Sequence, residues 1–301
     1  MSLLVREPGL YSLAVDLGRP RSRALGVPLG GAADRAALAI GNALVGNEPH
    51  AAALEVTLFG PVLEALHPTA CVIFGAPFAA TRNGDPLTPG FTFQLEVGDV
   101  LRVGGAPTGA RACVCVAGGF DVPEVLGSRT ALEPLRAGEV LPCAPSRGAG
   151  RGVDWPAPTE PTVLRALPGP QAEWFAPGFF AHEYEVLPAS NRMGVRLNGP
   201  ALSRRAGELA SEAVAPGAVQ ITNDGLPIVL GVDGQTIGGY PKVAHVIRAD
   251  LDALAQLRPG ARVRFALVTA AEAEAAARDR TAALAQVLAR VRAAEREPVR
   301  G

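Results

Sequence analysis

The segment from Val232 to Lys242 carries the densest group of chemically useful side chains in this sequence. It reads Val-Asp-Gly-Gln-Thr-Ile-Gly-Gly-Tyr-Pro-Lys, so an acid, an amide, hydroxyls and a cation surround three glycines. Glycine lets the backbone turn at positive φ and approach a ligand closely. A structural turn whose polar residues face water is the alternative interpretation. The density of polar groups favours a site for a small molecule.

Each polar group of this segment suits a role in binding or catalysis. Asp233 can hold a cation or act as a base, Gln235 presents a donor and an acceptor to an amide, and Lys242 offers a positive charge to carboxylate or phosphate. Lys242 taken alone fits a solvated surface lysine equally well. Further hydrogen bonds come from two hydroxyls and from consecutive glycine N–H groups, in Thr236, Gly238, Gly239 and Tyr240.

A second polar cluster, Ser190-Asn191-Arg192-Met193-Gly194, lies about forty residues upstream. Arg192 can grip a carboxylate as a fork, Asn191 can hydrogen-bond a substrate amide, and Met193 can form an apolar wall. An ordinary loop with an Asn turn and a surface arginine is the alternative. We predict that this cluster and the glycine-rich segment converge in one hollow.

A third group of residues lies near the start of the chain. Asp16 and Arg19 flank a glycine in Asp16-Leu17-Gly18-Arg19, and we expect them to form a pair at a domain junction. Glycine turns followed by a helix N-cap at Asp34 explain the same stretch without a functional role.

Composition excludes several classes of function. The net charge of -1 gives no basic surface for nucleic acid, and no apolar run is long enough to span a membrane. There is no P-loop, no glycine-rich βαβ unit and no cysteine or histidine spacing typical of zinc, so no metal site is predicted. Cys113 and Cys115 alternate with valines and are expected in a core strand. A cytoplasmic location follows from this pattern of cysteines and the lack of a signal segment.

The chain divides into two β-rich halves. Residues 146–161 are rich in Pro, Gly, Ser and Arg and form the expected linker between an N-terminal domain, 1–145, and a C-terminal domain, 162–301. Apolar residues alternate from Phe91 to Val97 and from Arg262 to Leu267, which is typical of half-buried strands. The fold is therefore expected to be mainly β with a few helices.

Two helices have clear sequence signals. One runs from Asp34 to Val45 and ends before Gly46-Asn47. The other runs from Ala270 to Glu297, where Thr269 and Glu272 match a capping box. Its apolar stripe should pack on the same chain, although a partner subunit is the alternative; the stripe consists of Leu284, Val287, Leu288 and Val291.

Several motifs, in order along the chain, resemble the biotin-dependent carboxyltransferase, or allophanate hydrolase subunit 2, family. The resemblance covers nearly the whole chain. It is carried by Asp16-Leu17-Gly18-Arg19, Gly30-Gly31-Ala32, Gly41-Asn42, Ala117-Gly118-Gly119-Phe120-Asp121, Leu167-Pro168-Gly169-Pro170, Ser190-Asn191-Arg192-Met193-Gly194 and Asp233-Gly234-Gln235-Thr236-Ile237-Gly238-Gly239-Tyr240-Pro241.

The resemblance implies a fold of two cyclophilin-like β-barrel domains plus a C-terminal helix. It also implies the function of the C subunit of an ATP-dependent 5-oxoprolinase, which opens 5-oxoproline to L-glutamate together with subunits A and B and is inactive alone. ATP and Mg²⁺ are the implied cofactors, with no metal or biotin on this chain. The alternatives are the carboxyltransferase component of a biotin-dependent urea or amide carboxylase, and a regulatory protein that antagonises a kinase inhibitor.

For the 5-oxoprolinase function, the hypothetical roles follow the chemistry of each group. Asn191 and Gln235 would bind the lactam, and Arg192 would bind the carboxylate. Lys242 and the Gly238-Gly239 amides would receive phosphate, and Asp233 would face magnesium. Three positions depart from the family pattern: Val15 replaces Gln, Ile237 replaces Thr, and the loop after Thr130 is shorter.

Overall fold

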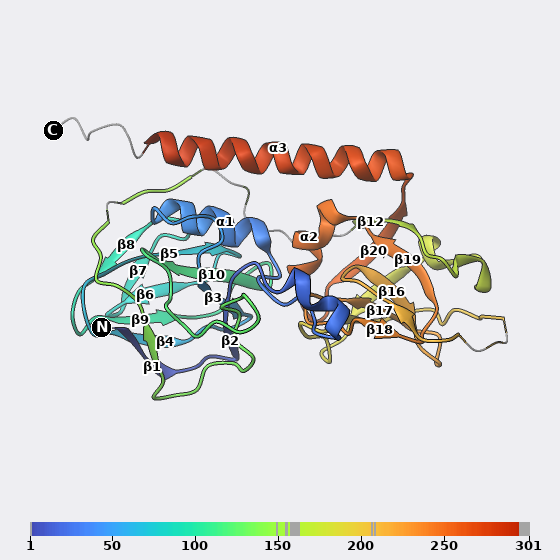
Figure 1. Ribbon diagram of the computed structural model, residues 1–301, viewed down its shortest axis with the longest axis horizontal. Helices are drawn as coiled ribbons and strands as arrows, with labels where there is room; N and C mark the ends of the chain where they lie inside the picture. The colour runs from blue at the N-terminus through green and yellow to red at the C-terminus, as the bar shows by residue number, and fades with distance from the viewer. Residues whose placement is uncertain are drawn as a thin grey trace. The chain divides into compact units, whose positions relative to one another are not determined.

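The computed structural model describes residues 2–148, 150–153, 156, 163–205, 207 and 209–294. These residues form a mainly β protein with a few helices and a long C-terminal helix, which confirms that part of the expected fold (Figure 1). Packing divides the chain into two compact units. Unit 1 consists of Met1–Gly18, Asp34–Thr159 and Ala282–Gly301, and unit 2 of Arg19–Ala33 and Glu160–Thr281.

Unit 1 contains two antiparallel sheets, with strand orders β11-β1-β4-β9-β6-β7 and β2-β3-β10-β5-β8. Apolar side chains from both sheets, including Leu63, Leu101 and Val114, share one buried core. The strands are β1 (Ser2–Glu7), β2 (Tyr11–Val15), β3 (Ala53–Thr57), β4 (Val62–Ala65), β5 (Thr69–Gly75), β6 (Ala80–Arg82), β7 (Asp85–Leu87), β8 (Phe93–Leu95), β9 (Val100–Val103), β10 (Arg111–Val116) and β11 (Val140–Pro142).

Helix α1 (Arg35–Leu44) covers the β5 and β10 part of the second sheet. It begins as expected at Asp34, whose side chain accepts a hydrogen bond from Ala37 N at 2.9 Å. A Cβ on Gly41 would lie only 2.8 Å from Cys115 Sγ, so the helix and strand pack closely. Cys113 and Cys115 are buried in β10, as predicted, and burial raises the pKa of the Cys115 thiol. Such a thiol stays protonated and unreactive at neutral pH.

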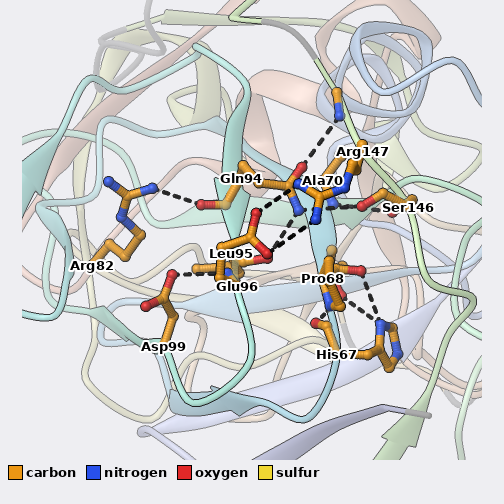
Figure 2. A network of polar contacts seen from close by, with 12 residues as sticks. His67, Pro68, Ala70, Arg82, Gln94, Leu95, Glu96, Asp99, Ser146 and Arg147 are labelled. Atoms are coloured by element: carbon orange, nitrogen blue, oxygen red, sulfur yellow. Dashed lines mark hydrogen bonds and ion pairs between the residues drawn. The ribbon is translucent and has the colours of Figure 1, made fainter.

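Polar contacts within unit 1 hold the first residues of the expected linker (Figure 2). Ala70 N donates to Ser146 Oγ at 3.0 Å, Gln94 Nε2 donates to Ser146 O at 3.2 Å, and Arg147 pairs with Glu96 at 2.9 Å. The first residues of this segment are thus bound to β5 and β8. Positions 149, 154, 155 and 157–161 of the expected linker lie outside the described residues.

Unit 2 is built on a closed barrel of seven strands, in the order β12-β19-β16-β17-β14-β13-β20. Its interior is filled by apolar side chains such as Val219, Val263 and Phe265. The strands are β12 (Val163–Pro168), β13 (Glu183–Val186), β14 (Gly194–Asn198), β16 (Ala218–Ile221), β17 (Pro227–Leu230), β19 (Lys242–Val246) and β20 (Arg262–Leu267), and a separate ribbon pairs β15 (Glu212–Ala213) with β18 (Ile237–Gly238). The short helices are η1 (Pro20–Leu25), η2 (Ala172–Trp174), η3 (Phe179–Ala181), η4 (Arg248–Asp250) and α2 (Leu251–Ala255).

Helix α3 (Ala270–Ala294) has the start that the sequence predicts. Thr269 N donates to Glu272 Oε2 at 2.7 Å, and Glu272 N donates to Thr269 Oγ1 at 3.3 Å, which is a capping box. Val287 and Val291 of the predicted stripe are buried, so the stripe packs on its own chain. The expected positions 295–297 lie outside the described residues. In the part of the chain that the structure describes, no helix has the length and apolarity to cross a bilayer.

Two segments pack with a different unit from the one that a simple division at residues 146–161 assigns. The last part of α3, from Ala282, belongs to unit 1, and Arg19–Ala33 belongs to unit 2. Gly30 N donates to Val232 O at 2.9 Å, which ties this early segment to the glycine-rich loop of unit 2. The first part of the chain therefore contributes directly to the region that the motifs mark.

Candidate functional site

The two polar clusters predicted to converge are packed against each other in unit 2. Asp233 N donates to Arg192 O at 3.1 Å, and Gly231 N donates to Met193 O at 2.9 Å. A Cβ on Gly231 would lie 2.3 Å from Arg192 O, so only glycine permits this approach. The contact between the two loops is thus a main-chain junction.

Arg192 links three segments of the chain by its guanidinium. Its Nε and Nη2 donate to the two carboxylate oxygens of Asp233 at 2.7 and 3.0 Å, and Nη2 also donates to Gly31 O at 2.7 Å. The Arg192 side chain is 4% exposed and that of Asp233 27%. A buried bidentate pair of this kind fixes the loops relative to one another.

The ion pair between Arg192 and Asp233 also bears on whether Asp233 can bind a metal ion. Both oxygens of Asp233 accept hydrogen bonds from Arg192, whose positive charge already balances the carboxylate. Among the described residues, no three His, Cys, Asp or Glu side chains gather as a cation site. Mg²⁺ prefers several oxygen ligands in octahedral geometry. The residues of this region therefore do not fit the magnesium site expected at Asp233.

Lys242 begins β19 and is buried beside the ribbon. Its ammonium group forms an ion pair with Glu212 of β15, and its backbone N donates to Gln171 Oε1 at 3.1 Å. Gln171 Nε2 in turn donates to Glu212 Oε1 at 2.9 Å. The ammonium group of Lys242, aided by the hydrogen bond from Gln171, lowers the pKa of the Glu212 carboxyl. The charge of Lys242 is thus already matched within the protein.

A cavity of about 500 Å³ lies beside the ribbon in unit 2. Its volume falls within the range of small-molecule pockets, about 300–1,000 Å³. Gln235, Gly239 and Tyr240, three of the residues predicted for a site, line it. The other lining residues are Arg204, Gly207, Leu209 and Asn223. Among the described residues, none hydrogen-bonds or pairs with the side chains of Arg204, Asn223, Gln235 or Tyr240. These polar groups are open to a ligand.

Gly238 lies where two side-chain amides meet. A Cβ there would be 2.5 Å from Gln235 Nε2 and 2.7 Å from Gln220 Nε2, so the two nitrogens are close neighbours. Gln220 is 2% exposed, and its Nε2 has no hydrogen-bond partner in the described part of the protein. Thr236 is buried, and its carbonyl accepts from Val214 N at 3.0 Å. The buried amide of Gln220 therefore lies near that of Gln235.

The remaining predicted residues of the second cluster do not line the cavity. Asn191 Oδ1 accepts from Met193 N at 2.8 Å, which is the Asn turn that the sequence left open as an alternative. The Met193 side chain is exposed. Asn191, Arg192 and Met193 therefore shape the loop next to the cavity and are not part of its lining.

Asp16 and Arg19 belong to separate units. Asp16 accepts hydrogen bonds from Ser128 Oγ at 2.5 Å, Arg129 N at 2.7 Å and Thr130 Oγ1 at 2.8 Å. It thereby fixes the short segment from Ser128 to Thr130 of unit 1. Arg19 is buried in unit 2, where its backbone N donates to Leu29 O at 2.6 Å.

The contacts of Asp16 predict a pH-dependent stability. Burial tends to raise the pKa of Asp16, but the hydrogen bonds from Ser128, Gly18, Arg129 and Thr130 overcome it and leave the pKa below the ordinary value of 3.8. The stabilisation is present above pH 3.8 and is lost as the pH falls through the lowered pKa. We expect Asp16→Asn to destabilise unit 1 at pH 7 and to lose that effect progressively as the pH falls below 3.8. Urea unfolding at pH 7 and at a series of pH values below 3.8 measures this, and a deficit that stays the same throughout would contradict it.

A smaller cavity in unit 1 is the other candidate. Its volume is about 180 Å³, and Thr92, Arg147 and Arg151 contribute to its lining. Arg147 is paired with Glu96, as described above, and the cavity holds none of the predicted site residues. The unit 2 cavity is therefore the better candidate.

The sequence motifs did not reveal every residue of the site. Arg204 and Asn223 lie outside all of them, and no spacing rule marks either one. Gln220 carried a signal that could have been used, because a lone amide stands between Val219 and Ile221 in a short strand. Such a residue must face the opposite side from its apolar neighbours.

The sequence and fold have clear relatives. Residues 25–267 match the family described as carboxyltransferase domain, subdomain A and B. The chain is 35% identical to the 5-oxoprolinase C subunit of Escherichia coli, over 92% of this chain and 94% of the relative, and 35% identical to that of Haemophilus influenzae, over 86% and 88%. It is 30% identical to a urea amidolyase of Lachancea kluyveri, of which it covers 16%.

Solved structures agree. A crystal structure of the protein TTHA0988 matches with a TM-score of 0.81 and 36% identity. The match covers 88% of this chain and 56% of that one. The urea amidolyase of K. lactis matches with a TM-score of 0.85 and 27% identity over 94% of this chain and 20% of that one. On the extent of the sequence match, this chain belongs to the carboxyltransferase domain family of subdomains A and B.

Proposed function

We propose that this chain is the C subunit of an ATP-dependent 5-oxoprolinase that works with subunits A and B. The observation that carries the proposal is the 35% identity to a 5-oxoprolinase C subunit over 92% of this chain and 94% of the relative. Two proteins that match along nearly their whole lengths have the same domain content. The urea amidolyases, by contrast, contain a corresponding region as a small part of a longer chain.

The task that we assign to this chain is binding and orienting the lactam. A lactam presents one N–H donor and one C=O acceptor, and the amide of Gln235 can satisfy both types of group. Tyr240 adds a hydroxyl, and Gly239 has no side chain to occupy the cavity. Arg192 and Asp233 are positioning residues in this proposal, because their contacts are with each other and with Gly31.

ATP and Mg²⁺ are assigned to the partner subunits. A lactam is a stable amide with a poor leaving group, and ATP supplies the activation that its opening requires. The carboxylates of the described residues do not fit a magnesium site, and Lys242 is paired with Glu212. The chain is therefore expected to be inactive alone. Two finer points belong to the same proposal: that both units have cyclophilin-like folds, and that the protein works in the cytoplasm.

One alternative has specific support. The urea amidolyase relative is 30% identical over 87% of this chain, so carboxyl transfer from biotin to an amide nitrogen is a second candidate activity. It predicts a biotin-carrier protein as partner and a requirement for bicarbonate.

Reconstitution tests the two activities together. The chain is co-expressed with subunits A and B, and glutamate and ADP formed from 5-oxoproline are measured with and without it. We expect glutamate formation to require this chain. Equal rates without it would overturn the proposal, and bicarbonate-dependent turnover of urea with a biotin carrier would establish the alternative.

A further inference from the structure

Two consecutive arginines of unit 2, Arg204 and Arg205, lie in a segment whose backbone is hydrogen-bonded to a neighbouring segment. Arg205 N donates to Trp174 O at 2.8 Å, and Arg204 forms an isolated antiparallel bridge with Phe175. These contacts anchor an extended stretch of main chain onto the segment around η2.

The side chains of Arg204 and Arg205 lie in different surroundings. The guanidinium of Arg205 lies 4.5 Å from the centre of the Trp174 ring, a cation–π contact. Successive side chains of an extended backbone point to opposite faces. Arg204 therefore points away from the indole ring, and it lines the 500 Å³ cavity.

The charge of Arg204 has no counterpart among the described acids of the neighbouring loops. Asp233 pairs with Arg192 and Glu212 with Lys242. Asp224, next to the lining residue Asn223, accepts the hydroxyl of Thr222, which is the main cause of its lowered pKa. These three carboxylates thus have other partners. Arg204 brings a positive charge to a cavity whose other described polar side chains are neutral.

We propose that Arg204 is a specificity-determining residue that binds the carboxylate of the substrate. This inference rests on the proposed function. It gives the substrate class of the cavity as small cyclic amides that carry a carboxylate, as opposed to neutral amides such as urea. The guanidinium fork matches a carboxylate in two parallel hydrogen bonds. The amides of Gln235 and Asn223 and the phenol of Tyr240 remain for the lactam. Arg204 takes the place that the sequence motifs suggested for Arg192.

A phosphate group is the other anion that arginine binds. Phosphate sites in proteins combine several cations or a nest of main-chain N–H groups. Arg204 is the single charged residue among those that line this cavity in the described chain. A single guanidinium beside the neutral amides of Asn223 and Gln235 favours a carboxylate over a phosphate. The test described next distinguishes carboxylate binding from phosphate binding.

The test compares two ligands that differ only in the carboxylate. Calorimetry on the complex of subunits A, B and this chain, without ATP, gives the Kd of 5-oxoproline and of 2-pyrrolidone, the same ring without its carboxylate. We expect the wild type to bind 5-oxoproline at least tenfold more tightly. Arg204→Ala should abolish the preference, Arg204→Lys should restore part of it, and the matched control Arg205→Ala should keep it.

Each outcome decides the matter. A wild type without preference, or an Arg204→Ala variant that keeps it, would overturn the inference. So would a raised KM for ATP in Arg204→Ala with an unchanged KM for 5-oxoproline, because the residue would then serve phosphate. If glutamate forms without this chain, the proposed function fails by itself. The same ligand pair, titrated into the isolated chain and its Arg204→Ala variant, then still decides whether the cavity selects carboxylates.

Discussion

Replacing Arg192 with alanine is expected to lower the free energy of unfolding of unit 2 by about 3 kcal/mol, the low end for a broken buried ion pair. The variant leaves the Asp233 carboxylate without its guanidinium and Gly31 O without its donor. We take the low end of the range because the Asp233 side chain is 27% exposed. In the variant, water can solvate its carboxylate and so offset part of the lost interaction. Turnover of the complex should fall with it, because the loop that carries Gln235 loses its anchor.

The measurement needs a signal from unit 2 alone, because two units need not unfold together. The chain has two tryptophans, Trp155 and Trp174, so a Trp155→Phe background reports on Trp174 during urea unfolding. Arg264→Ala, which removes an exposed pair with Glu183, is the control and should have a much smaller effect. Equal unfolding curves for the two variants would show that the Arg192 pair does not stabilise the site.

Gly231→Ala is expected to destabilise the same junction by about 1–3 kcal/mol, the usual cost of overpacking. Its Cβ would lie 2.3 Å from Arg192 O, a main-chain atom that cannot rotate away. The two loops must separate to accommodate it. Trp174 fluorescence during unfolding again gives the stability, and the KM for 5-oxoproline reports the displacement of Gln235.

Gly239→Ala is the matched control for stability. It lies in the same segment, and its Cβ would meet Ser211 Oγ at 3.4 Å, an ordinary contact. We expect little loss of stability there. If Gly231→Ala is as stable as Gly239→Ala, the loops are not locked together by the main-chain contact described above.

The secondary structure was largely predictable because its signals are local. The capping box at Thr269 and the N-cap at Asp34 involve residues three positions apart, and both are present. Alternation of apolar residues likewise located strands such as β20 (Arg262–Leu267). The closed barrel of unit 2 was part of the fold that the family resemblance implied. Unit 1, in contrast, has two sheets, which no local pattern specifies.

The partners of individual side chains were the part that could not be predicted. Nothing in the spacing of Arg192 and Asp233 says that they bind each other, because the pairing depends on how two loops meet in space. Lys242 is similar, since its partner Glu212 belongs to a ribbon of two-residue strands. The sequence therefore predicted ligand roles for Arg192, Asp233 and Lys242, whereas each of them pairs with another side chain of the protein. Arg204, which is left unpaired by the described part of the fold, had no motif to mark it.

The KM for 5-oxoproline of the reconstituted complex carrying Gln235→Ala tests the central claim most directly, namely that the locked loops present Gln235 to a substrate cavity. The account predicts a KM raised at least tenfold, about 1.4 kcal/mol of binding. Ile237→Ala, an exposed neighbour that does not line the cavity, should leave the KM unchanged. An unchanged KM for Gln235→Ala, in a complex that still requires this chain for turnover, would contradict it.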